Sequence, residues 1–263
     1  MDTEQTIKYV VSNKVSVSRY GDGEYEIMRN RGNGFQNYEK SLSERLKEVL
    51  NKPIANHLVC IPIALNSVSL YKEESRIKWI SFICRNWRTI TKNTPINRIY
   101  GNSLCTRFYI IMDDTSKSGE TAESLKQIWA DRDVCIIEGQ NTRLGVGNDL
   151  LNGCKSVKRI ICPAQDAWEK YDEIIDAVCK NVNKNKLILC ALGMTATVLS
   201  FDLAKLGYQA IDIGHIDLEY EWMRMGVNKK CDVPGKAVNE LGHNIVQPIE
   251  APYYDSEILL KIG

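Results

Sequence analysis

The sequence predicts an α/β fold with a Rossmann-like, mostly parallel sheet flanked by helices. In the C-terminal half, short apolar runs typical of buried strands alternate with segments whose apolar residues recur at helical spacing. This alternation indicates parallel strands joined by helical crossovers, because parallel neighbours need a long connection. The 263 residues contain no repeat and no polar linker, so we expect residues 1–263 to form a single domain.

The N-terminal third predicts alternating helices and strands. Residues 3–12 have apolar side chains at helical spacing, and "KVSVS" then alternates in the manner of a strand. The stretch "SLSERLKEVLN" predicts an amphipathic helix that is capped by Ser41 or Ser43. "HLVCIPI" predicts the next strand, and "ESRIKWISFICRNWRTI" predicts a helix with basic residues between its apolar ones.

The C-terminal half is more regular. Strands are predicted at "DVCIIEG", "VKRIICP", "KLILCAL" and "YQAIDIG", and helices at "DAWEKYDEIIDAVCKNV" and "TATVLSFDLAKLG". In open α/β sheets, ligands bind at the carboxyl ends of the strands. We therefore single out the residues that follow predicted strands, with "RFYIIM" counted as a strand: Asp22, Glu24, Asp113, Asp114, Glu138, Gly193, Thr195, His215 and Asp217.

The composition argues against several classes of protein. A net charge of +1 argues against a nucleic-acid partner, because neutralising phosphates requires a clearly basic surface. The nine cysteines include no C-x-x-C pair and have no zinc spacing to the three histidines. The apolar runs around four of them indicate buried thiols in a reducing compartment: Cys60, Cys135, Cys162 and Cys190.

Membrane insertion is not predicted. No apolar stretch approaches the length needed to cross a bilayer, and "MDTEQTIKYV" does not have the pattern of a signal peptide. We expect the protein in the cytoplasm or at the inner face of the membrane.

The stretch "GDGE" contains two carboxylates: Asp22 lies between the two glycines, and Glu24 follows the second one. If the backbone is extended, Asp22 and Glu24 point to the same side, and Gly23 lets the chain approach a ligand closely. Two carboxylates on one face repel unless a cation lies between them, and such oxygen ligands suit Mg²⁺ or Mn²⁺ bridged to phosphates. An isolated D-x-E is more often a solvated turn, so both interpretations stay open.

Three further stretches suit an anion or a sugar. The segment "EGQNTRLGVGND" has three glycines that could expose N–H groups, and Arg143 could donate two hydrogen bonds to phosphate. Gly193 and Thr195 precede and open an apolar helix, where free amides could hold phosphate. Arg107 lies beside aromatic residues and could pair with phosphate or stack on a base. A connecting loop, a helix cap and a surface arginine are the alternatives.

A dense polar stretch, "DIGHIDLEYEWM", follows the last predicted strand. It holds His215, Asp217, Glu219 and Glu221, a concentration that would cost stability without a ligand or counter-charge. We interpret Glu221 as a solvated helix residue and expect some of the others to be functional.

The order of these strings resembles the DUF1792 family, glycosyltransferases with the GT-D fold. The matching strings cover nearly the whole chain and include "SRYGDGE", "GNSLCTRFY", "VCIIEGQNTRLGVGNDL", "RIICPAQDAWEKYDEI", "TATVLSFDLAKLGYQAIDIGHIDLEYEWM" and "AVNE". The resemblance implies a bacterial, metal-dependent enzyme that transfers a hexose, with glucose as the first expectation, from a UDP-sugar. The acceptor would be a glycan or glycoprotein in surface glycan biosynthesis.

The resemblance also implies roles for individual residues. Asp22 and Glu24 would be the D-x-E motif that binds Mn²⁺ or Mg²⁺ and the donor diphosphate. The nucleotide sugar would be bound by Arg19, Gly21, Arg107, Arg143, Gly193, Thr195 and His215. An inverting reaction is implied, and it needs a general base. Asp217 is the first candidate because it directly follows a strand end, and Glu138 and Asp113 are alternatives.

Two other functional classes are alternatives to this one. A nicotinamide-dependent oxidoreductase predicts a G-x-G-x-x-G turn after the first strand, and the sequence has none. A non-catalytic nucleotide-sugar or glycan-binding module would keep the phosphate-binding loops without needing a metal, and it stays open. An oligomer is compatible with each interpretation.

Overall fold

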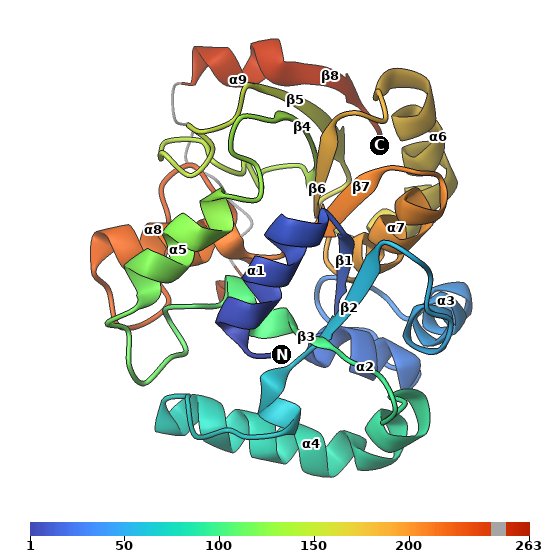
Figure 1. The fold of residues 1–263 in the computed structure, drawn as a ribbon, viewed down its shortest axis with the longest axis vertical. Coiled ribbons are helices and arrows are strands. Elements are labelled where there is room, and N and C mark those ends of the chain that lie inside the picture. The colour runs from blue at the N-terminus through green and yellow to red at the C-terminus, as the bar shows by residue number, and fades with distance from the viewer. Residues whose placement is uncertain (243–250) are drawn as a thin grey trace.

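The computed structural model describes residues 1–242 and 251–263. Its centre is an eight-stranded sheet in the order β3-β2-β1-β7-β6-β4-β5-β8, in which all paired strands are parallel (Figure 1). The predicted α/β class, with a parallel sheet and flanking helices, is confirmed. The strands are β1 (Ser16–Arg19), β2 (His57–Ile61), β3 (Gly101–Asn102), β4 (Asp133–Gly139), β5 (Ser156–Cys162), β6 (Leu187–Ala191), β7 (Gln209–Asp212) and β8 (Ile258–Lys261).

Helices cover both faces of the sheet. In the described part of the chain they are α1 (Thr3–Asn13), α2 (Asp22–Met28), α3 (Lys40–Asn51), α4 (Glu73–Asn93), α5 (Ser118–Lys126), α6 (Tyr171–Asn181), α7 (Met194–Lys205), α8 (Ile216–Met225) and α9 (Pro252–Glu257). One core packs α1, α5 and α8 against the sheet, and two others pack α6 and α7, and α2, α3 and α4, on the opposite side.

Strand residues alternate between these cores. In β4, Val134 and Ile136 face the α1, α5 and α8 layer, whereas Cys135 and Ile137 face α6 and α7. Side chains on a strand point to opposite faces in turn, so a strand with helices on both sides is apolar at every position. The four cysteines predicted to be core residues are all free and buried.

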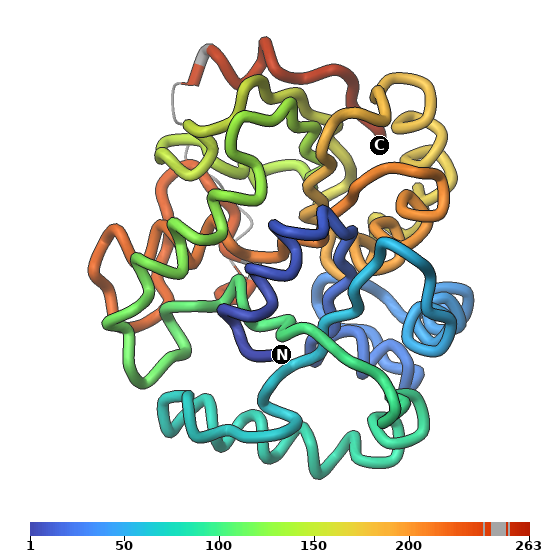
Figure 2. Tube along the Cα trace, in the orientation of Figure 1, coloured from blue at the N-terminus to red at the C-terminus, as the bar shows by residue number. Residues whose placement is uncertain are grey.

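Two segments far apart in the sequence, β1 and β7, meet in the middle of the sheet. β1 pairs with β7 through Val17 and Ile211, so the N-terminal and C-terminal parts of the trace run side by side there (Figure 2). The carboxyl ends of both strands therefore open at the same edge.

Three predictions of local structure were wrong. The helix over "SLSERLKEVLN" begins at Lys40 with Glu39 as its N-cap, so neither Ser41 nor Ser43 caps it. "GDGE" is not an extended turn, because Gly21 caps α2 and Asp22 is its first residue. Residues two apart on a helix point about 200° away from each other, so Asp22 and Glu24 do not share a side. "RFYIIM" is not a strand of the sheet, and its only pairing among described residues is an isolated antiparallel bridge between Tyr71 and Met112.

His57, at the start of β2, is buried as a neutral imidazole. Its Nε2 lies 2.8 Å from the Ser18 hydroxyl, and its ring meets the Phe201 ring edge-on at 5.1 Å. Burial, together with the positive charges of Arg98 and Lys205, lowers the pKa of His57 to about 3.

The pH dependence of stability should report this residue. The unfolded chain protonates His57 near its ordinary pKa of about 6.5 while the folded chain does not, so stability is fullest above that pH and falls as the pH decreases towards 3. We expect His57 to contribute a loss of roughly 1.4 kcal/mol per pH unit between pH 6 and 4. Urea unfolding should show a flatter profile for His57→Gln, and equal slopes in both proteins would contradict the assignment.

Candidate active site

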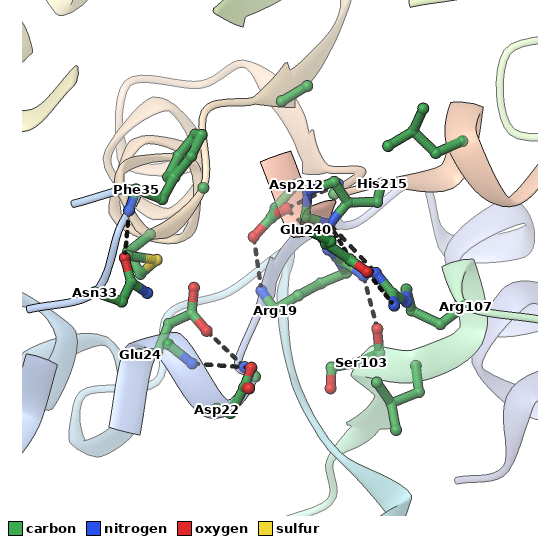
Figure 3. Close-up of a pocket in the computed structure, with 18 of the residues that line it drawn as sticks. Arg19, Asp22, Glu24, Asn33, Phe35, Ser103, Arg107, Asp212, His215 and Glu240 are labelled. Carbon is green, nitrogen blue, oxygen red and sulfur yellow. Dashed lines mark hydrogen bonds and ion pairs between the residues drawn. The ribbon is translucent and has the colours of Figure 1, made fainter. Parts of the chain in front are cut away.

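A cavity of about 530 Å³ lies at the carboxyl ends of β1, β6 and β7 (Figure 3). Its wall is built from the residues that directly follow these strands, and from two loops of the N-terminal half. The lining side chains and backbone include Arg19 to Glu24, Asn33 to Phe35, Ser103, Leu104, Arg107, Ala191, Gly193, Met194, Asp212, Gly214, His215, Asp217, Leu218 and Glu240. The predicted location at the strand ends therefore coincides with this cavity.

Two helices begin at the cavity wall. Gly193 and Met194 stand at the N-terminus of α7, and Gly214 and His215 stand at that of α8. The first turn of a helix leaves backbone N–H groups without intrahelical partners and carries the positive end of the helix dipole. The wall is thus suited to a ligand with negative charge.

A side chain would not fit at position 193. Its φ of 53° is a left-handed conformation, and a Cβ built on it would lie 2.3 Å from the Phe35 ring. The Phe35 side chain therefore covers the start of α7 because residue 193 is glycine.

Two buried carboxylates face each other at the bottom of the cavity. Glu24 and Asp212 are bridged by the Thr197 hydroxyl, at 3.4 Å from Glu24 Oε1 and 3.2 Å from Asp212 Oδ2. That hydroxyl has one proton and also lies 2.9 Å from the carbonyl oxygen of Arg19, so it cannot donate to all three acceptors. Burial and then the charge of Asp212 raise the pKa of Glu24 to about 7. The pair would be stabilised by an added positive charge.

Arg19 balances only one of these acids. Its Nε lies 3.3 Å from Asp212 Oδ1, and its Nη1 donates to the Ser103 carbonyl at 2.7 Å and to the Thr106 hydroxyl (Figure 3). Burial nevertheless raises the pKa of Asp212, with Arg19 acting in the opposite direction. Sequence reasoning missed Asp212, although an acid inside the apolar run "YQAIDIG" was a visible signal.

Asp22 is the accessible acid of the D-x-E motif. It is exposed at the cavity wall, and its recorded hydrogen bond is from its own neighbour, Gly23 N, at 3.1 Å. Glu24, by contrast, is buried and accepts from Gly21 N at 2.6 Å. The described residues contain no group of three or more His, Cys, Asp or Glu that could hold a metal ion. The described residues thus offer at most a partial set of hard oxygen ligands, of the kind that Mg²⁺ completes with substrate phosphates and water.

Arg107 is held by acids of its own. Its Nε lies 3.1 Å from Glu219 Oε1, and its Nη1 and Nη2 bind Glu240, which also pairs with Lys230. Burial by itself would lower the pKa of Arg107, but the two carboxylates raise it well above its usual range. Its charge is therefore already matched before any ligand arrives.

His215 stands beside this ion-pair cluster with 44% of its side chain exposed. Partial desolvation in the cavity wall, with the nearby positive charges of Arg107 and Arg19, lowers its pKa to about 4 in spite of Glu240. Nδ1 lies 3.5 Å from Arg107 Nη1, which can only donate. We assign the proton of the neutral ring to Nε2 on that basis, which makes Nε2–H a donor.

Of the three predicted bases, Asp217 alone lines the cavity. Its carboxylate accepts from Gly145 N at 3.0 Å and from Asn148 Nδ2 at 2.8 Å, and it pairs with buried Lys236 at 2.6 Å. Asp217 therefore also ties the loop after β4 to α8.

The other two predicted bases lie elsewhere. Glu138 is fully buried, where it accepts from Arg159 and from Leu144 N, and burial raises its pKa despite Arg159. Asp113 has 61% of its side chain exposed and pairs with Arg76 at 3.1 Å on the surface. Neither residue lines the cavity. The Glu138 side chain is buried in the core beside β4, and Asp113 does not follow a strand of the sheet.

Two predicted phosphate contacts also lie outside this wall. Arg143 lines a second cavity of about 910 Å³, where its guanidinium is 5.1 Å from the centre of the Tyr254 ring. Thr195 is fully buried in the first turn of α7. The remaining predicted binding residues, Arg19, Gly21, Arg107, Gly193 and His215, do line the first cavity.

Arg159 should contribute strongly to stability. It is buried and donates to Glu138 at 2.7 Å, to the Leu144 carbonyl at 2.9 Å and to Glu257 at 2.7 Å. Arg159→Met would leave Glu138 buried without its counter-charge, and we expect a loss of roughly 3 kcal/mol in urea unfolding. The double variant Arg159→Met with Glu138→Gln should recover part of this loss, and a single variant as stable as the parent would contradict the prediction.

Comparisons with known proteins agree on one family. Residues 17–241 match the family described as glycosyltransferase GT-D fold. The chain is 37% identical over 269 residues to the probable glycosyl transferase Gly of Streptococcus gordonii, covering 100% of this chain and 39% of that protein. It is 34% identical over 270 residues to glycosyltransferase GlyD of Streptococcus pneumoniae serotype 4 (strain ATCC BAA-334 / TIGR4), covering 98% and 32%. The chain thus spans less than half the length of either curated relative.

Solved structures extend the agreement to three dimensions. A DUF1792 domain described as a distinct glycosyltransferase fold is similar with a TM-score of 0.95 and 37% identity, over 100% of this chain and 95% of that one. A DUF1792 glycosyltransferase from Streptococcus sanguinis is similar with a TM-score of 0.95 and 34% identity, over 100% and 98%. The family resemblance noted in the sequence is confirmed.

Proposed function

Because the chain belongs to the glycosyltransferase GT-D fold family, we propose that it transfers a sugar from a nucleoside-diphosphate donor to an acceptor hydroxyl. We expect a UDP-hexose, with UDP-glucose first, and a glycan or glycoprotein acceptor. The observation that best supports this is the cavity itself, where two helix N-termini and a buried acid pair converge on one space.

We expect the donor diphosphate to bind at the starts of α7 and α8. Backbone N–H groups there suit phosphate oxygens, and His215 Nε2–H adds a neutral donor. Arg19 and Arg107 already form ion pairs with carboxylates, so they contribute by holding the cavity wall in place. Their predicted role as direct phosphate ligands becomes secondary.

The metal proposal rests on the acids of the D-x-E motif. Asp22 offers an accessible carboxylate, and Glu24 faces Asp212 with the single hydroxyl of Thr197 shared between them. Although Asp22 and Glu24 leave α2 in different directions, both line the cavity, and these two residues would hold Mn²⁺ or Mg²⁺. Such an ion would neutralise the charge left on the diphosphate when the sugar departs. Glu24 also holds the start of α2 by accepting from Gly21 N, and Asp212 holds Arg19 by an ion pair.

We assign the role of general base to Asp217, the one predicted base in the cavity wall. Its carboxylate would accept the proton of the acceptor hydroxyl. Three donors already bind its carboxylate, two at Oδ1 and one at Oδ2, so Oδ2 keeps one acceptor site for the proton of the acceptor hydroxyl. The reaction would invert the anomeric centre if Asp217 activates the acceptor for direct attack.

Donor turnover tests the proposal directly. A panel of UDP-, GDP- and dTDP-sugars would be incubated with the protein in Mn²⁺ or in EDTA, with nucleotide release and product anomer followed by NMR. Metal-dependent release from one UDP-sugar supports the proposal. Tight binding of a nucleotide sugar without any turnover would favour the non-catalytic binding module instead, and the absence of both binding and turnover would exclude both functions.

A further inference from the structure

The helix α4 carries apolar side chains on its solvent side. Ile77, Ile80 and Trp87 are 60%, 50% and 60% exposed, and Ile96 and Ile99 are exposed just after the helix ends. Of the five tryptophans, all of them in the described part, Trp87 is the exposed one. Figure 1 shows α4 along the lower edge of the molecule, outside α2 and α3.

These side chains form one stripe. Ile77, Ile80, Cys84 and Trp87 follow one another at intervals of three and four residues, which places them on one helix face. The side chains that α4 buries lie on the opposite face: Phe82, Asn86, Ile90 and Asn93. The stripe therefore plays no part in the packing of this chain.

Basic residues flank the stripe. Arg85, Arg88 and Lys92 are exposed along one side of it and form no ion pair with any described residue. From residue 75 to residue 112 the chain has no Asp or Glu, and it holds Arg76, Lys78, Arg85, Arg88, Lys92, Arg98 and Arg107. Arg76, Lys78 and Arg107 are paired with acids outside this stretch, so the excess of positive charge on this face comes from Arg85, Arg88 and Lys92.

We propose that the outer face of α4, made of Ile77, Ile80, Cys84 and Trp87 with Arg85, Arg88 and Lys92, docks on the surface of an anionic lipid bilayer. Apolar and indole side chains on one face with basic residues beside them are the composition of helices that lie in a membrane interface. The positive charge selects an anionic surface through the attraction of Lys and Arg to its headgroups. None of the helices in the described residues, α4 included, is both long and apolar enough to cross a bilayer, so the contact is with the surface.

Docking would fix the orientation of the cavity. Trp79, on α4, lines the cavity wall and packs edge-on against Phe82 at 5.5 Å. A bilayer on the outer face of α4 would therefore lie one helix away from the cavity. The proposal does not depend on which reaction takes place there.

Vesicle binding by the full chain tests the proposal. The protein would be titrated with vesicles of phosphatidylcholine alone, or mixed with phosphatidylglycerol, at low and high salt. Two variants probe the face: Ile80→Ser with Trp87→Ser, and Arg85→Gln with Arg88→Gln. Two matched controls change exposed residues elsewhere: Leu206→Ser with Met225→Ser, and Lys8→Gln with Lys180→Gln. Circular dichroism would establish that every variant is folded.

We expect binding to the mixed vesicles only, weakened by salt, with a blue shift of tryptophan emission. The arginine variant should bind at least roughly tenfold more weakly, since each basic residue near the surface is worth roughly a fivefold change. The apolar variant should also lose binding and the blue shift, and both controls should bind as the parent does. No preference for anionic vesicles, or equal binding by all variants, would overturn the proposal. A dimer that only the apolar variant dissociates would overturn it in favour of a second copy of the chain.

Discussion

Asp22→Asn is expected to lower the rate of sugar transfer by roughly a thousandfold while leaving the fold intact. The side chain is exposed at the first position of α2 and holds no other element in place. Asparagine has nearly the same shape but no negative charge, so the change removes a ligand for a divalent ion and little else. The loss corresponds to about 4 kcal/mol of transition-state stabilisation, in the range supplied by metal ions at a leaving phosphate.

The matched control is Asp113→Asn. Asp113 is also an exposed aspartate that follows an apolar run, but it does not line the cavity. Steady-state rates at saturating Mn²⁺, together with melting temperatures, would be compared for both variants. The role of Asp22 as a metal ligand would be contradicted if the two variants retained equal activity, or if Asp22→Asn kept the full dependence on Mn²⁺.

Asp217→Asn is expected to lower kcat by roughly a hundredfold to ten-thousandfold with little change in donor affinity, as the loss of a general base does. The amide can still accept a hydrogen bond from Gly145 N, but it cannot take the proton of an acceptor hydroxyl. Single-turnover transfer and donor binding by calorimetry would separate the two effects.

Lys236→Met is the partner variant. It removes the cation that lies 2.6 Å from Asp217 and 3.2 Å from Glu221, and it should therefore reduce stability. Its folded fraction should keep most of the transfer rate, because the carboxylate of Asp217 remains. If both variants lost the same activity and both weakened donor binding, Asp217 would instead act by holding the loop after β4.

The strands of the C-terminal half could be predicted within about two residues because buried parallel strands are continuous apolar runs. β3 could not, since two residues carry no pattern, and β8 is half exposed at the sheet edge. The helix that begins at Asp22 could not be predicted, because it contains Gly23 and glycine is a poor helix former. Packing of Tyr25, Ile27 and Met28 into the core with α3 overrides that preference.

Site residues could be predicted from the sequence where they directly follow a strand, because that position puts them at the cavity wall. Glycines and polar residues directly after β1, β6 and β7 do line the cavity, as the parallel topology requires. Ion pairs could not be foreseen, because they join residues far apart in the sequence. Arg107 meets Glu219 and Glu240 more than a hundred positions away, and neither this pairing nor that of Asp217 with Lys236 leaves a local pattern.

The pairing of β1 with β7 also determines when the site can exist. Arg19 and Asp212 are joined across 193 positions of the chain, and contacts of such sequence separation form slowly during folding. During synthesis, the acids of α2 emerge before β7 and have no opposing wall until β7 has left the ribosome. A nascent chain that ends before residue 212 therefore exposes half a site, and ligand binding can report the completion of the fold.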